Sequence, residues 1–279
     1  MSTLLQHLPR PLRIATQVLA LAVALAGATA CSTASRALTE NCEFDRDVSR
    51  TCVPDSKDKD PLPNTVARYG TRSMEEYVTR RGACRKATDD EFLRAFLCLC
   101  NGDRECVLTR VVQLGWDSAR QSDPTVAMRR FNQAWLVNPD SARVYWGFGT
   151  VYGHRLEFDQ AAEMFDHAVQ LSVANGQLPA LELSRLYCDF GFTLLQAAEK
   201  GAPETARVYW ERAGDLFQKS KDTHRDSGCC TYWKWALALF RLGEYEASWK
   251  KVHLSQSHEK QCPLPLLDDL RKAMPEPRQ

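Results

Sequence analysis

One set of residue spacings occurs twice in the middle of the chain and constrains the fold more than any other feature. In both copies small residues and large apolar residues recur at helical intervals, and the two copies lie about 34 residues apart. The matching residues are Tyr145, Phe148, Gly149, Tyr152, Ala161, Phe165 and Ala168 in one copy and Leu114, Gly115, Ala127, Phe131, Ala134 and Pro139 in the other. This pattern predicts paired helices, because small residues let helix backbones approach and large ones fill the remaining space.

The pattern resembles the tetratricopeptide repeat (TPR), in which each copy folds into two antiparallel helices. Pro139 suits the end of its copy, because the fixed backbone of proline ends a helix. Two further copies follow with more variation. The third is predicted from Tyr187, Phe190, Gly191 and Leu194 and, after an insertion at 200–203, from Ala206, Trp210 and Ala213; the fourth is predicted from Tyr232, Trp235, Ala236, Leu239, Ser248 and Val252.

The resemblance implies an all-α fold, an α-solenoid of about four TPR helix hairpins with an extension at each end. The predicted segments are a signal peptide at 1–30, a flexible tether at 31–69, a cysteine-rich helical segment at 70–107, the TPR domain at 108–260, and a capping helix with a tail at 261–279. Leu264, Leu267 and Leu270 have helical spacing, which predicts a helix that covers the open end of the stack.

The first thirty residues predict export. Arg10 and Arg13 precede an apolar run that ends in small residues, with no acidic residue among them, which is typical of a secretory signal peptide. Cys31 follows Ala28, Thr29 and Ala30, and the stretch resembles a bacterial lipobox. The resemblance implies that Cys31 is lipidated and that the protein faces the periplasm from the outer membrane, with the lipid as its only membrane attachment. Because Ala28 stands where leucine is usual, ordinary cleavage and a soluble periplasmic or secreted protein stay an alternative.

The cysteine count of the exported chain predicts disulfides, because an even number of cysteines in an oxidising compartment pairs readily. The candidates are Cys42, Cys52, Cys84, Cys98, Cys100, Cys106, Cys188, Cys229, Cys230 and Cys262. Cysteines two apart on a helix point to different sides, so Cys98 and Cys100 are expected to take separate partners, with Cys84 and Cys106 nearest. The preferred pairs further along are Cys188–Cys230 and Cys229–Cys262, and a strained Cys229–Cys230 bond is the alternative.

Charge and motifs exclude several function classes. The chain has 36 basic and 35 acidic residues and a net charge of +1, which leaves no basic surplus for nucleic-acid binding. No catalytic, phosphate-binding or Cys-x-x-Cys motif is present. The sequence therefore predicts a protein that is not an enzyme, with no cofactor and no metal site.

The TPR resemblance implies that the first helices of successive repeats line a concave groove. The positions that would contact a partner are Trp116, Arg120, Arg143, Trp146, Thr150, His154, Arg185, Phe192, Gln196, Trp233 and Arg241. None is acidic, so the acidic residues are expected elsewhere, and the partner is expected to be a protein or peptide with acidic side chains and apolar anchors. The alternative is that the rings pack between helices and the arginines pair with acids such as Asp117 and Asp189.

The leading hypothesis is a non-catalytic adaptor of the Gram-negative cell envelope that binds a protein or peptide in this groove. Two alternatives stay open. One is a thiol-redox or metal-binding periplasmic protein that uses the clustered cysteines. The other is a structural envelope component that assembles with itself.

Overall fold

A computed structural model describes residues 90, 92–200, 203–225, 231–259 and 265–277. Within these ranges every regular element is helical, which confirms the all-α prediction for this part of the chain. The predicted signal peptide, the lipidated Cys31 and the tether lie outside the described residues. So do the cysteines predicted to form disulfides at 42, 52, 84, 229, 230 and 262.

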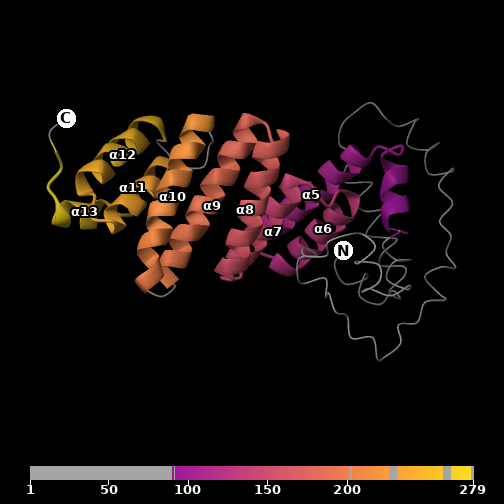
Figure 1. Cartoon of the computed structure of the whole chain (residues 1–279), viewed down its shortest axis with the longest axis horizontal. Coiled ribbons are helices and arrows are strands. Elements are labelled where there is room, and N and C mark those ends of the chain that lie inside the picture. Colours follow the sequence, from indigo (N-terminus) through magenta and orange to yellow (C-terminus); the bar gives the residue numbers. More distant parts are fainter. Residues whose placement is uncertain (1–89, 91, 201–202, 226–230, 260–264, 278–279) are drawn as a thin grey trace, which may run out of the picture.

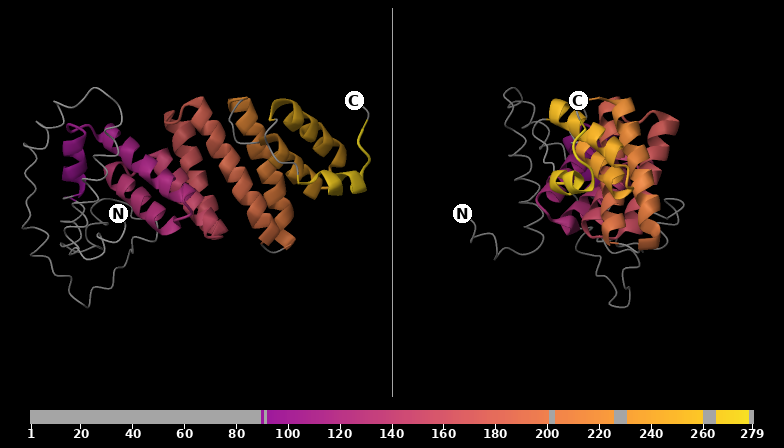
Figure 2. Two further views of the ribbon diagram at one scale, coloured as in Figure 1. Left: turned by 180° about the vertical axis from the view of Figure 1, so that it is seen from behind. Right: turned by 90° about the vertical axis from the view of Figure 1, so that its left-hand side faces the viewer.

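The helices follow one another in a row from one end of the molecule to the other (Figure 1). After a helix that includes residues 92–99 come α5 (Arg104–Arg120), α6 (Pro124–Val137), α7 (Ala142–His154), α8 (Phe158–Asn175), α9 (Ala180–Lys200), α10 (Pro203–Thr223), α11 (Thr231–Arg241), α12 (Tyr245–His258) and α13 (Leu267–Ala273). From α5 to α13 each helix packs on the next one in the chain. The result is a solenoid-like stack, seen from two further directions in Figure 2.

Aspartates define where the first two long helices begin. The Asp103 carboxylate accepts hydrogen bonds from the backbone N–H groups of Glu105 and Cys106 at the start of α5. The Asp123 carboxylate accepts from the N–H of Val126, and Pro124 occupies the first turn of α6. These side chains satisfy backbone donors that have no partner within the helix, and proline is well placed there because it has no N–H.

The two sides of the stack differ in how closely its helices approach. The first helices of successive pairs contact one another, α5 with α7, α7 with α9, and α9 with α11. The corresponding contacts between second helices are marginal or absent in the described part of the chain. The first helices therefore lie on the inner side of the stack.

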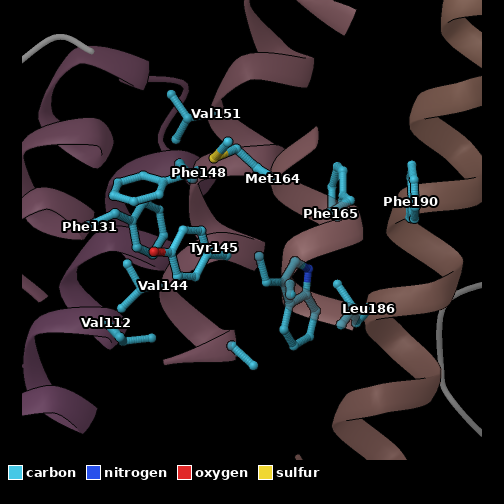
Figure 3. Packing of buried hydrophobic residues seen from close by; sticks show 14 of the residues in the cluster. Val112, Phe131, Val144, Tyr145, Phe148, Val151, Met164, Phe165, Leu186 and Phe190 are labelled. Carbon is cyan, nitrogen blue, oxygen red and sulfur yellow. The ribbon is translucent and has the colours of Figure 1, made fainter. Parts of the chain in front are cut away.

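Buried aromatic rings, among them Phe131 and Phe165, pack between the helices of the first two pairs (Figure 3). The ring of Phe131, on α6, lies between Gly115 of α5 and Gly147 of α7, and a Cβ atom added to either glycine would come within 2.6 Å or 2.3 Å of it. Phe165 occupies the same place against Gly149, and its ring stacks on Phe190 at a centroid distance of 5.1 Å. The spacing that predicts these helix pairs thus corresponds to real close approaches of backbone and ring.

The third pair keeps this arrangement in a different register from the predicted one. The ring that lies against Gly191 belongs to Phe217, where the sequence pattern assigned Trp210 to this place. Both α9 and α10 are 21 residues long, longer than the helices of the other pairs. The insertion lengthens these helices, so the buried set on α10 shifts toward its C-terminal half, where Ala213, Phe217 and Ser220 are fully buried.

The last pair has smaller residues at the two matching positions and a separate small core, in which Trp249 is fully buried. Ala236 takes the place of the glycine, and Val252 is the buried residue at the position of the aromatic ring. The Ser248 hydroxyl donates to the backbone carbonyl of Ala236 at 2.8 Å. Beyond them α13 contributes the fully buried Leu270 to the same cluster. Because this core is small, the end of the stack depends more on polar contacts.

Candidate functional site

The inner side of the stack carries the residues that the sequence singled out, and we call this surface the A-helix face. Its contacts run from α5 to α11 through side chains of the first helices. The residues that make them are Glu105, Trp116, Asp117, Arg120, Arg143, Trp146, Glu182, Arg185, Asp189, Phe192, Glu199, Trp233, Lys234 and Arg241.

Aromatic rings form two groups on the A-helix face. Trp116 and Trp146 meet edge to face with their centroids 5.1 Å apart. Phe192 and Trp233 meet in the same way at 6.4 Å. Trp146 is only 8% exposed, whereas Trp116, Phe192 and Trp233 are partly exposed. The rings therefore pack between helices, and three of them also leave apolar surface exposed on this face.

Arg143 joins three helices. Its guanidinium donates two hydrogen bonds to the Glu182 carboxylate of α9, at 2.9 and 3.3 Å, and one to Glu105 of α5 at 3.2 Å. The hydrogen bond with Glu182 raises the pKa of Arg143 further above its ordinary value, against the effect of burial. A bidentate pair of this kind fixes the arginine in one orientation. Arg143 consequently links α5, α7 and α9 and is not a free cation.

Two other predicted arginines also have partners within the chain. Arg120 pairs with Asp117 on its own helix, and Arg241 of α11 pairs with Glu199 of α9 at 3.1 Å. The expectation that acidic residues lie away from this surface is therefore wrong. Asp117 pairs with Arg120 within one helix, and the packing of neighbouring first helices brings Glu182 to Arg143 and Glu199 to Arg241.

The centre of the A-helix face holds a carboxylate and an ammonium group that sequence reasoning did not select as a pair. Asp189 accepts a hydrogen bond from the indole N–H of Trp146 at 3.1 Å. Burial raises the pKa of Asp189, while Lys234, Trp146, Arg185 and His154 act in the opposite direction. In the sequence Asp189 stood out only as a possible partner of an arginine, and Lys234 gave no signal.

Lys234 reaches this centre from α11. Its Nζ lies 4.7 Å from the centroid of the Phe192 ring and 3.6 Å from the Cys188 sulfur. Burial lowers the pKa of Lys234, and the negative charge of Asp189 opposes that shift. Each group thus supplies charge compensation for the other, although no direct ion pair joins these two described residues.

The other predicted contact residues lie on the first helices with differing exposure. The Thr150 hydroxyl donates to the backbone carbonyl of Trp146 at 3.0 Å, so it is turned toward its own helix. His154 and Arg185 are exposed, and Gln196 is partly exposed. These last three side chains are accessible to solvent.

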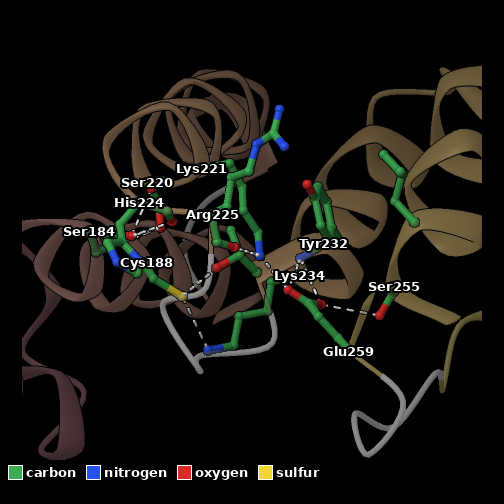
Figure 4. A network of polar contacts seen from close by, with 12 residues as sticks. Ser184, Cys188, Ser220, Lys221, His224, Arg225, Tyr232, Lys234, Ser255 and Glu259 are labelled. Atoms are coloured by element: carbon green, nitrogen blue, oxygen red, sulfur yellow. Dashed lines mark hydrogen bonds and ion pairs between the residues drawn. The ribbon is translucent and has the colours of Figure 1, made fainter. Parts of the chain in front are cut away.

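A second polar cluster closes the C-terminal end (Figure 4). Lys221 of α10 and Glu259, just after α12, form an ion pair of 2.7 Å in which the two side chains are only 8% and 10% exposed. The Glu259 carboxylate also accepts from the backbone N–H of Tyr232 and from the Ser255 hydroxyl. Lys221 lies 4.0 Å from the Tyr232 ring centroid and donates to the carbonyl of Arg225. This arrangement ties three helices together, and its burial suits a structural role.

The described cysteines that the sequence predicts to form disulfides are disulfide-bonded. Cys100 and Cys106 are bonded, with their Cα atoms 5.8 Å apart. Cys100 lies in the turn after residues 92–99, not in that helix, and the turn brings it back toward α5. Cys98 and Cys188 are also disulfide-bonded. Because Cys106 is bonded to Cys100, the remaining predicted partner of Cys98 is Cys84, which lies outside the described residues, as does Cys230, the predicted partner of Cys188. A redox role for Cys229 and Cys230 falls outside the described residues too.

Other kinds of site find little support among the described residues. Within the described ranges no three acidic, histidine or cysteine side chains come close enough together to hold a metal ion. None of the described helices has both the length and the apolar character needed to span a membrane. Open surface hollows lie along α12, beside Lys250 and His253, away from the A-helix face.

The chain was also compared with known proteins. A scan against models of protein families found no match, and a search of the curated proteins found none either.

Proposed function

We propose that this protein is a non-catalytic adaptor of the TPR type, which binds a segment of a partner protein on its A-helix face. The observation that carries the proposal is the clustering of Trp116, Trp146, Phe192 and Trp233 on the inner side of the stack. Rigid rings supply large contact area at a low cost in conformational entropy. A row of first helices also presents them at regular intervals, which suits an extended segment.

The proposal includes a position in the Gram-negative cell envelope. The N-terminal pattern supports export and attachment of a lipid at Cys31, with the folded part in the periplasm. The disulfide between Cys100 and Cys106 is in keeping with an oxidising compartment. An adaptor held near a membrane meets its partners at a raised local concentration, which favours moderate affinities.

Crosslinking in intact cells tests the binding surface. A photoreactive amino acid is placed at His154 or Gln196, which are accessible on the first helices, and in the matched controls at Val173 or Val208. The controls are exposed on the second helices α8 and α10, at 65% and 61%. We expect discrete crosslinked products from His154 and Gln196 only. Equal products from all four positions, or products from the controls alone, would rule out the A-helix face.

The lipid attachment has its own test. Cells are grown with a clickable fatty acid, and the protein is isolated from wild type and from a Cys31→Ser variant. We expect label and membrane fractionation in wild type and loss of both in the variant. A labelled or membrane-bound Cys31→Ser protein would show that the attachment lies elsewhere, and an unlabelled soluble wild type would favour ordinary cleavage.

A further inference from the structure

The charges of the A-helix face compensate one another. Its cations are Arg120, Arg143, Arg185, Lys234 and Arg241, and its anions are Asp117, Glu105, Glu182, Asp189 and Glu199. An acidic partner would have to compete with carboxylates already hydrogen-bonded to Arg143. The surface consequently lacks the uncompensated positive charge that attracts an acidic segment.

The centre of this face keeps unused hydrogen-bonding capacity. A carboxylate can accept several hydrogen bonds, and Asp189 accepts one, from Trp146. An ammonium group has three donors, and the contacts of the Lys234 Nζ are the Cys188 sulfur and the face of the Phe192 ring. Both groups are partly covered by neighbouring helices, so bulk water is restricted there. Polar groups in such a place gain from a partner that supplies the missing bonds.

One chemical group can bind an acceptor on α9 and a donor on α11 at the same time. An amide offers an N–H and a C=O in fixed relation, and it carries no charge. The Phe192 ring lies beside the Lys234 ammonium group and, together with Trp233, offers partly exposed apolar surface to a side chain next to that amide.

Building on the proposed function, we propose that Asp189 and Lys234 bind an amide group of an uncharged, extended partner segment. The amide N–H donates to the Asp189 carboxylate, and its C=O accepts from the Lys234 ammonium. A neighbouring apolar side chain packs on Phe192 and Trp233, which are partly exposed. The partner is then neutral with apolar anchors, in place of the acidic segment that the sequence suggested.

The test selects short peptides from a random display library on the full chain, purified in detergent. Affinities of the selected peptides are measured for wild type, for Asp189→Asn and for Lys234→Met. The matched control is Asp166→Asn, which removes the charge of a half-exposed residue paired with Arg212 between the second helices. A second series replaces each peptide amide in turn by an ester, which removes one N–H donor and leaves the protein unchanged.

We expect uncharged peptides whose dissociation constant changes less than about threefold between about 50 and 500 mM salt. One ester position should weaken binding to wild type about tenfold, because a hydrogen bond to a charged group is lost. The same ester should weaken binding to Asp189→Asn less, by about threefold, because the asparagine carbonyl still accepts the N–H but carries no charge. Lys234→Met should also weaken binding about tenfold, and Asp166→Asn should leave it unchanged.

Two results overturn the inference and leave the proposed function standing. In one, peptides crosslink from His154 but are acidic and lose affinity steeply with salt. In the other, they crosslink from His154 but no ester position is coupled to Asp189. Selected peptides that crosslink from Val173 and not from His154 overturn the proposed function, and the inference with it. If Asp189→Asn does not fold, the ester series on wild type and on Lys234→Met decides the matter.

Discussion

In the stretch from α5 to α10, aromatic rings rest directly on glycines of the facing helices, and one apolar core runs through all of them. In the stretch from α11 to α13 the glycine is replaced by Ala236, the core is small, and the buried Lys221–Glu259 pair ties the helices together. Close packing of rings on glycines thus holds the helices together in the first region, and a buried ion pair does so in the second. A buried ion pair that loses one partner leaves an uncompensated buried charge, which is strongly destabilising.

The largest effect is expected from Glu259→Ala. The change leaves Lys221 buried without its carboxylate and removes the acceptor for the Tyr232 N–H, which should cost about 3–5 kcal/mol. Urea unfolding gives the free energy, and hydrogen exchange should show the loss concentrated in α11 and α12. Glu246→Ala is the control, because its pair with Lys250 is exposed. Equal loss of protection in α5–α8 would contradict the division into two regions.

A smaller loss of stability is expected from Gly147→Ala, which tests the close packing of rings on glycines. The new methyl group would come within 2.3 Å of the buried Phe131 ring, and overpacking of this kind costs about 1–3 kcal/mol. Gly214→Ala is the matched control on α10, where the nearest atom would be 3.8 Å away. There alanine should stabilise the helix by up to about 1 kcal/mol. Thermal unfolding of both variants compares them, and a stable Gly147→Ala protein would contradict the tight seat of Phe131.

The junction of the two regions is probed by Asp189→Asn and Lys234→Met, singly and together. Because each charge compensates the other across α9 and α11, the double variant should be more stable than the sum of the single effects by about 1 kcal/mol. Chemical denaturation of the four proteins gives this coupling energy. Additive effects would mean that the two groups act independently.

The smallest effect concerns pH. Burial raises the pKa of Asp189 above its ordinary value of 3.8, so the folded state holds that proton more tightly than the unfolded state. The stability that Asp189 contributes is fully present below pH 3.8 and is lost as the pH rises through the raised pKa. The stability of wild type relative to Asp189→Asn should therefore fall over that interval. Melting curves in a pH series measure it, and a difference that grows with pH would contradict burial as the dominant cause.

The contrast between regions also shows how far sequence reasoning reached. The first two helix pairs follow the predicted spacing, and Phe131 and Phe165 lie where the pattern assigns them. The third pair was misplaced because α10 offers two similar sets, one around Trp210 and one around Phe217, each with alanine at a helical interval. Helix length decided between them, and spacing alone contains no information about the length of α9 and α10.

The candidate site was predicted in part. Arg143 and Trp146 lie together on the inner side of the stack as expected from their positions in the repeat. Their partners were not found, since Glu182 is 39 residues from Arg143 and Asp189 is 43 residues from Trp146. Lys234 was missed because a single lysine in a helix most often lies in solvent, and only packing of α11 on α9 covers it.

The amino-acid sequence by itself determined that the chain forms helices in pairs and which small and large residues meet between them. That information is local, because helical periodicity and the sizes of side chains three and four positions apart are written along one segment. Only the tertiary structure decided which charges neutralise each other on the A-helix face and how the C-terminal end is closed. Those contacts depend on the stagger and rotation of helices from different pairs, and a change of one helical turn would exchange every partner.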